Sequence, residues 1–412
     1  MNRCFTYLAF MLSLTACHSI TSNSHRKIGE SYIADTSYET IPIDIGDDKS
    51  IYLFDSIIES VEVIPLETTA GNLIGTISKV IEMDDKYIVA DYNKAKSIFV
   101  FDKTGKFLNR IGRRGEGKGE YSDIHQMAID NNGNLMIVDL TLMKILSFTT
   151  MGELISEQKM PHYITEICPL SDSTFLLFSG SRENPHVSDT NYGLMHVDKN
   201  MEVKDQWFEY PKSSDIINYG VFNRFNDTIH LWMPMFGDNF IYEYKNGKIF
   251  CVYKFDFKGK QLPVNFLDLH PKVQDQLEQL SKLEYCNLTY IFETESFIYF
   301  TYTYKGNDAY WGIYNKKKHT SNNEILFDHS SNSLYSPIIN SVSNNHLISI
   351  INPQEMSTDM KEIKKSSYKM VIKYNVTHNM SDDDKNKLEH QLVNADNNPV
   401  LLVYKLNVDN EI

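Results

Sequence analysis

The sequence predicts an all-β protein built from repeated four-stranded antiparallel sheets, because two series of hairpin turns recur in phase along it. Asn-Gly and similar pairs accept the positive φ angles that tight hairpins require. Runs rich in β-branched and aromatic residues, such as YIVADY and SIFVFD, lie between the turns and are typical of strands. The first series is Asp84-Asp85, Asn132-Gly133, Asp172-Ser173, Asn226-Asp227, Glu295-Ser296 and Asn344-Asn345. The second series is Thr104-Gly105, Met151-Gly152, Asn200-Met201, Asn246-Gly247 and Lys316-Lys317.

The spacing of the second series gives the architecture. Gly105, Gly152, Met201 and Gly247 are 47, 49 and 46 residues apart (152 − 105, 201 − 152, 247 − 201). This is the period of a propeller blade, and six turns of the first series predict a six-bladed β-propeller. The next step is 70 residues (317 − 247), and a helical insertion near 268–286 explains the excess. The apolar residues at helical spacing in that insertion are Val273, Leu277, Leu280 and Leu283.

The last blade needs a strand from the start of the domain. The terminal strand at 399–407 follows a long excursion at 353–397, in which Ser381 is an N-cap and three aspartates form an acidic first helical turn. Residues 367–376 suit a strand or a helix equally. We expect 59–67 to supply the missing fourth strand, because joining the two chain ends closes the ring and leaves no open sheet edge.

The N-terminus has the pattern of a lipoprotein signal peptide. An apolar run after Arg3 is about ten residues long, which is too short for the roughly twenty residues that cross a bilayer. Small residues directly before Cys17 resemble the lipobox, in which the cysteine is acylated and becomes the first mature residue. We therefore expect a signal peptide at 1–17, a flexible tether at 18–50 and the propeller at 51–412. Because no acidic cluster follows Cys17, we expect an outer-membrane lipoprotein that faces the periplasm.

Charge and cysteine content argue against several classes of protein. Without residues 1–17 the chain has 39 basic residues (40 − 1, for Arg3) and 54 acidic residues, a net charge of −15. Such a surface repels a polyanion, so no nucleic-acid partner is expected. Cys168, Cys251 and Cys286 are odd in number and form no CxxC pair, so a disulfide framework is not expected, although one bridge stays open.

Three segments carry a family resemblance. They are VEVIPLET at 61–68, IFVFDKTGKFLNRIGRRGEGKGEY at 98–121 and NPVLLVYKLN at 398–407. In these segments the chain resembles the uncharacterised six-bladed β-propeller lipoproteins of Gram-negative bacteria, relatives of the NHL-repeat and TolB-like propellers. The resemblance implies the fold but no activity, because the family has no agreed catalytic residues. Where relatives often have Gly-Pro-Gly-Glu, this chain has Gly-Lys-Gly-Glu at 117–120.

The glycine-rich stretch GRRGEGKG at 112–119 is the main candidate site. It departs from the phosphate-binding pattern GxxxxGK[ST] because Gly119 replaces the hydroxyl residue and no helix is expected to follow, so no nucleotide is expected. The four glycines of this stretch suit a tight crossing between blades. Its charged side chains are either simply solvated or form a contact site for a carboxylated glycan or an acidic partner. The candidate contacts are Arg113, Arg114, Lys118, Glu120 and Tyr121.

No catalytic residue, cofactor or metal site is predicted. The thirteen histidines form no HxxH, HExxH or HxH pair. Those expected near blade edges, where distant ligands could gather, are His125, His162, His186 and His196. A calcium-like run at 130–134 lacks the acidic twelfth ligand, since that position is Thr141, and no GxSxG motif is present.

The sequence therefore favours a non-enzymatic envelope module that binds a glycan, peptide or protein partner on one propeller face. The alternative is an enzyme, a lyase or hydrolase acting on a polysaccharide or peptide, with its site at the central channel. A purely structural envelope component is the third possibility. The 25 tyrosines and 22 phenylalanines fill the space between blades or stack on sugar rings, and periodicity does not separate these uses.

We predict that Cys17→Ser moves the protein out of the membrane fraction. Two or more acyl chains would supply the anchor, at about 0.8 kcal/mol for each buried methylene. The measurement is the distribution of the protein between the membrane pellet and the soluble envelope fraction, with Ser19→Ala as the control. Equal membrane retention of the two variants would contradict a lipid anchor.

Overall fold

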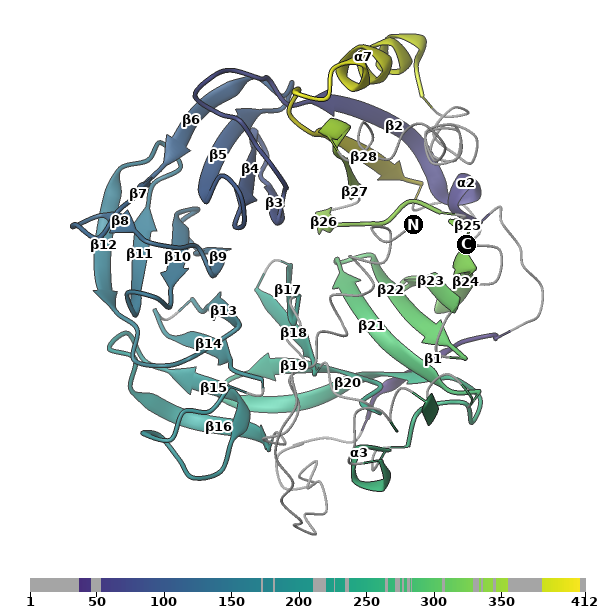
Figure 1. The fold of residues 1–412 in the computed structure, drawn as a ribbon. Helices are drawn as coiled ribbons and strands as arrows, with labels where there is room; N and C mark the ends of the chain where they lie inside the picture. Colours follow the sequence, from purple (N-terminus) through teal and green to yellow (C-terminus); the bar gives the residue numbers. More distant parts are fainter. Residues whose placement is uncertain are drawn as a thin grey trace.

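The computed structural model describes residues 37–45 and 53–407, apart from 172, 181, 210–219, 226, 234–236, 264–265, most of 271–283, 306–307, 329–332, 335, 344–345 and 355–379. Six antiparallel sheets stand around a central axis, as Figure 1 shows. Each has four successive antiparallel strands, with the first nearest the axis and the fourth on the perimeter. The predicted six-bladed β-propeller is therefore confirmed.

The strands of each blade follow one another in the chain, except in the sixth. The first blade contains β3 (Lys79–Glu82), β4 (Lys86–Asp91), β5 (Ser97–Asp102) and β6 (Phe107–Ile111). The second contains β9 (Gln126–Ile129), β10 (Leu135–Asp139), β11 (Lys144–Phe148) and β12 (Leu154–Lys159). The third contains β13 (Glu166–Pro169), β14 (Phe175–Phe178), β15 (Tyr192–Val197) and β16 (Val203–Glu209).

The later blades are longer and carry additions at their outer edges. The fourth contains β17 (Phe222–Phe225), β18 (Thr228–Trp232), β19 (Phe240–Lys245) and β20 (Lys248–Asp256). The fifth contains β21 (Cys286–Glu293), β22 (Phe297–Tyr304), β23 (Asp308–Asn315) and β24 (Thr320–Asp328), with β25 (Ser333–Leu334) beside it. The sixth contains β26 (Ser341–Ser343), β27 (His346–Ile351), β28 (Val400–Leu406) and β2 (Ile58–Pro65).

The sixth blade joins the two ends of the domain, as predicted. β2 pairs with β28 along its whole length, with Val61 opposite Tyr404 and Pro65 opposite Val400. Tyr404 is fully buried, its ring packs edge to face on Phe54 at 5.0 Å, and its hydroxyl lies 3.1 Å from Ser349 Oγ. The pairing therefore closes the ring with backbone hydrogen bonds and a packed aromatic ring.

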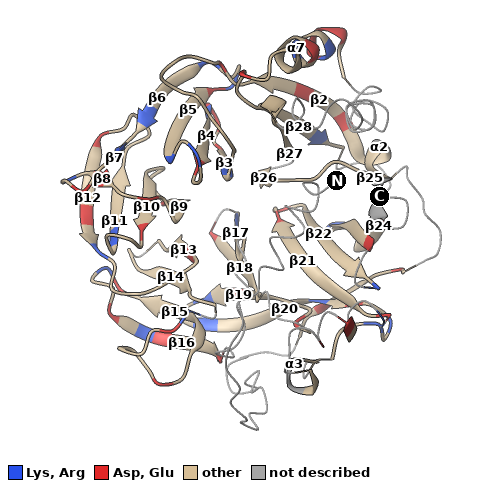
Figure 2. Ribbon diagram, in the orientation of Figure 1, with Lys and Arg blue, Asp and Glu red and all other residues tan. Residues whose placement is uncertain are grey.

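The core is divided into six parts, one at each junction between neighbouring blades. A blade is a single sheet, so the side chains on its two surfaces can be buried only against the two neighbouring blades. This explains why the second strands are buried over nearly their whole length, as in β4 and β10. The inner strands β9 and β26 carry no charged residue, whereas the outer strands β12 and β16 carry several (Figure 2).

Side chains of the innermost strands link successive blades around the axis. At five of the junctions among the described residues, a side chain of one blade bonds to the next blade in the ring. These bonds run from Lys79 Nζ to Gln126 Oε1 (3.0 Å), from Gln126 Nε2 to Thr165 O (3.3 Å), from Val221 N to Glu166 Oε2 (2.7 Å), from Asn223 Nδ2 to Ile291 O (3.4 Å) and from Ser341 Oγ to Val80 O (3.1 Å).

Turns between third and fourth strands clasp the preceding blade at the perimeter. Gly105 has a φ of +87°, and a Cβ there would lie 2.2 Å from Pro65 O of the sixth blade. Only glycine tolerates both the dihedral angle and this close approach. Glu67 N also donates to Gly105 O at 2.8 Å. The predicted turn is thus part of the contact between blades.

Two junctions contain the same cluster of a glutamate, a histidine and a lysine. In each, the glutamate ends the innermost strand, the lysine comes from the outer turn of the same blade and the histidine comes from the preceding blade. The clusters are Glu82 with Lys103 Nζ (2.6 Å) and His346 Nδ1 (3.1 Å), and Glu293 with Lys316 Nζ (2.6 Å) and His230 Nδ1 (2.8 Å). Each cluster pairs a buried carboxylate at a junction.

Part of the expected tether belongs to the fold. Glu39–Pro42 form β1, which runs parallel to β20 at the outer edge of the fourth blade, so the tether prediction is wrong for these residues. The reason is hydrophobic burial, since Ile41 and Ile43 are fully buried between the fourth and fifth blades. Cys17 and the rest of the expected signal peptide lie outside the described residues.

The helical insertions lie where the sequence predicts them. α3 (Phe266–Leu269) starts the first insertion, in which the described residues Asp275, Glu278, Gln279 and Lys282 are also helical. Its predicted apolar stripe, and the ambiguous residues 367–376, lie outside the described residues. α2 (Leu53–Ile57), which precedes β2, is a further short helix that the sequence did not predict.

α7 (Asp382–Val393) is the helix of the second insertion. Ser381 Oγ accepts a hydrogen bond from Asp384 N (3.1 Å), which confirms the predicted N-cap. α7 lies along β2 (Figure 1), where Asp384 Oδ1 accepts from Val63 N at 3.4 Å. Among the described residues, no helix combines the length and apolar character that a membrane crossing requires.

We predict that Tyr404→Ala costs about 3–5 kcal/mol of unfolding free energy, because it leaves a cavity in the blade that closes the ring. Tyr404→Phe should cost only about 1 kcal/mol, through the lost contact with Ser349. Urea unfolding followed by tryptophan fluorescence measures both. The control is Leu108→Ala, since Leu108 is 49% exposed on β6. A loss for Tyr404→Ala no larger than for Leu108→Ala would sink this account of closure.

Candidate functional site

The two faces of the propeller differ in their connections. On one face, turns of two to five residues join each first strand to the second. Connections after second and fourth strands emerge on the other face, because neighbouring strands are antiparallel, and we call this the loop face. Its longest connections span 66–78, 112–125, 179–191, 257–285 and 352–399. Long connections on a rigid scaffold are where binding residues usually lie.

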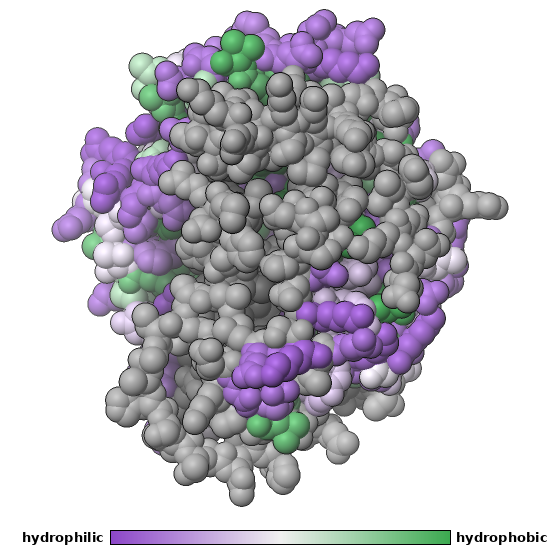
Figure 3. Space-filling model, turned by 45° about the vertical axis from the view of Figure 1, so that its right-hand side comes forward, coloured by the Kyte–Doolittle hydropathy of each residue, from purple (hydrophilic) through white to green (hydrophobic). Residues whose placement is uncertain are grey.

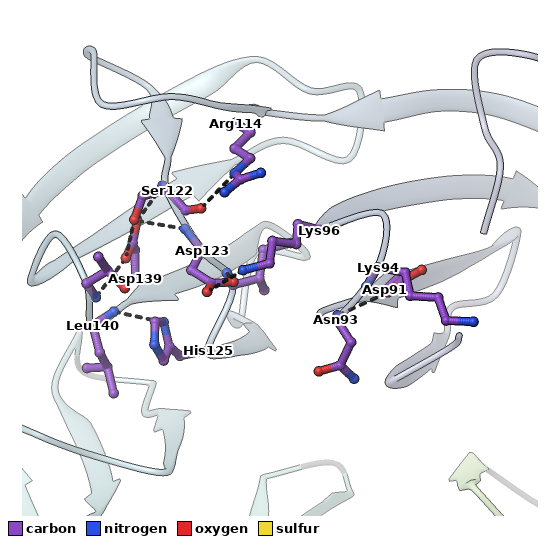
Figure 4. Close-up of polar contacts among 12 residues, drawn as sticks. Asp91, Asn93, Lys94, Lys96, Arg114, Ser122, Asp123, His125, Asp139 and Leu140 are labelled. Atoms are coloured by element: carbon purple, nitrogen blue, oxygen red, sulfur yellow. Dashed lines mark hydrogen bonds and ion pairs between the residues drawn. The ribbon is translucent and has the colours of Figure 1, made fainter. Parts of the chain in front are cut away.

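Two buried aspartates order the loop face in the first two blades (Figure 4). The Asp139 carboxylate accepts from Ser122 N (2.6 Å) in the connection that enters the blade and from Thr141 N (2.9 Å) in the turn after β10. Asp91 does the same with Gly75 N and Lys94 N, each at 2.8 Å. Each carboxylate therefore ties an inter-blade connection to the neighbouring turn.

The glycine-rich stretch forms a compact loop between the first and second blades. β7 (Arg113–Arg114) and β8 (Glu120–Tyr121) pair in parallel at the perimeter, near β12 (Figure 1). Arg113 Nε lies 2.6 Å from Glu120 Oε1, and Arg114 Nε donates to Ser122 O at 3.3 Å. The Glu120 carboxylate accepts a hydrogen bond from Gly117 N–H, and this bond and the charge of Arg113 lower the pKa of Glu120. The charges thus brace the loop, while Arg113, Arg114 and Lys118 stay exposed.

Tyr121 is wrongly predicted as a contact residue. Its side chain is fully buried in the cluster between the first and second blades, and a Cβ on Gly112 would lie 2.8 Å from its ring. The aromatic ring fills the junction and cannot meet a partner. The neighbouring Gly119 N–H, which a phosphate-binding loop would offer to an anion, donates to Glu157 Oε2 at 2.7 Å.

His125 presents a defined hydrogen-bond donor on the loop face (Figure 4). Leu140 N donates to His125 Nδ1 at 3.1 Å, so the proton of the neutral ring is on Nε2. Burial lowers the pKa of His125; Asp123 and Asp139 oppose the shift, and Arg182 and Lys96 reinforce it. Lys96 Nζ and Asp123 Oδ2 form an ion pair at 2.8 Å beside the ring. The imidazole is therefore kept neutral, with Nε2–H as its donor.

A second group lies where the connection between the second and third blades meets the loop 179–191. The Asn184 side chain accepts from Tyr163 N (2.8 Å) and donates to Tyr163 O (3.0 Å) and Arg182 O (3.4 Å). Tyr163 is 47% exposed, although Asn184 bonds to both its backbone N–H and its carbonyl oxygen. Arg182 Nε is buried and has no hydrogen-bond partner. An exposed aromatic ring and an incompletely bonded guanidinium therefore share one support.

Lys79, Gln126 and Glu166 begin the innermost strands of three successive blades. Burial lowers the pKa of Lys79, an effect that Glu166 opposes, and burial raises the pKa of Glu166, an effect that Lys79 opposes. Such opposed shifts are found in acid–base sites. Here, however, both side chains bond to neighbouring blades, with Glu166 accepting from Val221 N. We assign them to the ring of contacts around the axis.

Two of the four histidines considered as edge ligands, His162 and His186, lie side by side, but no metal-binding group forms around them in the described part of the chain. His162 Nδ1 lies 3.1 Å from His186 Nε2, while His162 Nε2 donates to Met201 O at 2.7 Å. His196 instead contacts Thr174 Oγ1 at 2.9 Å. No group of three or more potential metal ligands occurs in the described part of the chain. The described cysteines Cys168, Cys251 and Cys286 are free and buried, and burial raises the pKa of each thiol to about 12.

Sequence reasoning placed the glycine-rich loop correctly between blades but missed Tyr163 and Arg182. Each stands alone in its segment, without a motif, and only the fold brings 160–165 and 179–191 together. The one available signal was length, since 179–191 is much longer than the equivalent connections 92–96 and 140–143.

The fold and this face together define a class: a six-bladed propeller that carries an elaborated polar loop face on a closed ring. The chain belongs to the family described as Domain of unknown function (DUF4934), whose model matches residues 38–405. The match starts just before β1 and ends within β28, so it covers the whole ring. This confirms the expected uncharacterised propeller family.

Two solved structures are similar to this chain. A Bacteroides fragilis NCTC 9343 protein provisionally assigned as exported has a TM-score of 0.66 and 20% identity, over 90% of this chain and 100% of that chain. A DUF4221 member from Bacteroides vulgatus ATCC 8482 has a TM-score of 0.49 and 12% identity, over 85% and 98%. The first likeness, at 20% identity, shows the fold alone. No curated protein matches the chain.

We predict that stability falls as the pH drops from 7.5 to 5.5. Burial lowers the pKa of His125 and of His162 below 6.5, so the unfolded chain binds more protons in this window and is favoured. Their contribution is complete above pH 6.5 and is lost as the pH falls through the lowered values. Urea midpoints of the wild type and of His125→Gln with His162→Gln test this. An equal pH dependence in the two proteins would refute it.

Proposed function

We propose that this protein is a non-enzymatic cell-envelope module that binds a glycan, peptide or protein partner on its loop face. One observation carries the proposal: all the long connections emerge on one face, and buried carboxylates and amides hold several of them in place. A rigid ring that presents ordered polar loops has little ordering entropy to lose when it binds. On the opposite face, the connections between successive strands are turns of two to five residues.

The surface chemistry supports a polar partner. On the side drawn in Figure 3, apolar residues of the described surface are scattered among hydrophilic ones. The exposed basic groups Arg113, Arg114 and Lys118 lie in a loop-face connection of a protein whose net charge is −14. They offer a local attraction to carboxylates that the rest of the surface would repel. A carboxylated glycan or an acidic peptide therefore suits this face.

The location we propose is the periplasmic side of the outer membrane, with Cys17 as the lipid anchor. The signal-peptide pattern of residues 1–17 supports it, as does the absence of an acidic cluster after Cys17. The described chain begins at the outer edge of the fourth blade, where β1 lies, so a tether there would leave the loop face uncovered. Membrane anchoring and partner binding would then use different surfaces.

The test is a charge reversal on the loop face. Arg113→Glu with Arg114→Glu should weaken binding to an array of envelope glycans and acidic peptides by about tenfold, mainly by slowing association. The matched control is Lys248→Glu with Lys317→Glu, which changes the net charge equally at exposed positions of the fourth and fifth blades. Equal effects of the two pairs, or retention of every ligand by both, would exclude the glycine-rich loop as part of the binding surface.

A further inference from the structure

Arg182 is the starting point, because the fold leaves it short of a partner. Its Nε is buried without a hydrogen bond, although its own backbone is fixed by Arg182 N donating to Ser179 O (3.0 Å) and by the Asn184 amide on Arg182 O. Buried polar groups nearly always have partners in native proteins, and those that do not call for an explanation. An oxyanion is the natural complement of a guanidinium, which binds carboxylates through two parallel hydrogen bonds.

Two further groups are held close to Arg182. His125 lies near enough for the guanidinium charge to lower its pKa, and it presents Nε2–H as a donor because Leu140 occupies Nδ1. The backbone of Tyr163 is also bonded to Asn184. The connection that contains Tyr163 is joined to β9, which directly follows His125, by the hydrogen bond from Gln126 Nε2 to Thr165 O. Hydrogen bonds thus hold the backbone around Tyr163 to that around Arg182 and to Gln126, the neighbour of His125.

The combination of groups selects one ligand class. A carboxylate alone would need only Arg182 and His125, whereas the 47% exposed ring of Tyr163 adds a flat apolar platform of the kind that faces a sugar ring. A uronic acid carries both features, a carboxylate and a ring with an apolar face, within one residue. An acidic peptide side chain offers the carboxylate without the rigid ring.

We propose that Arg182, His125 and Tyr163 form an acidic-sugar subsite on the loop face, which binds a uronate residue of a glycan. Arg182 takes the carboxylate, His125 donates to the same anion or to an adjacent hydroxyl, and Tyr163 stacks on the sugar ring. The inference rests on the proposed binding role of the loop face and names the ligand class. Arg114, which bonds to Ser122 beside Asp123 (Figure 4), lies toward the rim of the same face and would attract further carboxylates of the chain.

The test uses the full chain with Cys17→Ser. Calorimetric titrations compare tetrasaccharides of galacturonate and of mannuronate with their carboxyl-reduced neutral counterparts. The wild type should bind at least one acidic tetrasaccharide about tenfold or more tightly than its neutral counterpart. Arg182→Gln should remove that preference through a loss of about 10- to 100-fold in acidic affinity, as expected for a hydrogen bond to a charged group.

Two tyrosine variants separate stacking from charge. Tyr163→Ala should weaken acidic and neutral ligands alike by about tenfold, whereas Tyr163→Phe should bind like the wild type. Urea unfolding of each variant shows whether it is folded, and Arg182→Lys provides a second variant at the same position that keeps the charge. It should recover part of the acidic preference without the two-pronged geometry.

The possible outcomes separate a failure of the acidic-sugar subsite from a failure of the proposed binding role of the loop face. Equal binding of acidic and neutral sugars, or an acidic preference that survives Arg182→Gln, would overturn the subsite while leaving a glycan-binding loop face. Binding of acidic peptides but of neither uronate would overturn the subsite and leave the peptide form of the proposed function. Binding of no sugar and no peptide on the loop face would overturn both.

Discussion

The pairing of β2 with β28 is the constraint on which the rest of the structure depends. A blade of one sheet buries its side chains only against its neighbours, so a row of six blades would expose two apolar surfaces unless its ends met. The chain solves this by placing its first blade strand beside its last, with seven residue pairs between Ile58 and Pro65 and one shift of register between Ile58 and Ser60. Closure turns these two surfaces into the sixth junction, so each of the six junctions has its own buried cluster.

Closure also fixes the geometry of everything attached to the ring. Hydrogen bonds between innermost strands set the spacing at the axis, and outer turns such as the one at Gly105 set it at the perimeter. Clusters such as Glu82 with Lys103 and His346 join three strands from two blades. Because the blades are held together both near the axis and at the perimeter, connections of very different lengths can emerge on one face without changing the arrangement of the sheets. This separation lets the loop face take on a function while the sheets stay constant.

The loop face uses a repeated device and then departs from it. Asp91 and Asp139 hold equivalent connections in the first two blades, while the third blade has Ser179 at that point and a longer loop. In this longer loop, the Asn184 side chain joins the backbone of Arg182 to that of Tyr163. The third blade thus departs from the pattern of the first two, and such local departures from a regular fold are often found at functional sites.

The sequence by itself determined the number of blades, most of their strands and turns, and the closing strand, because these depend on local patterns of turn residues and strand-forming residues. It also determined the N-cap at Ser381, which depends on the residue type at the helix start. It also placed the glycine-rich loop between two blades. Only the tertiary structure decided that Tyr121 is buried, that Ile41 and Ile43 add a strand to the fourth blade, and that Tyr163 and Arg182 lie together. Those outcomes depend on contacts between segments distant in the chain, and no local pattern encodes which partner a side chain will meet.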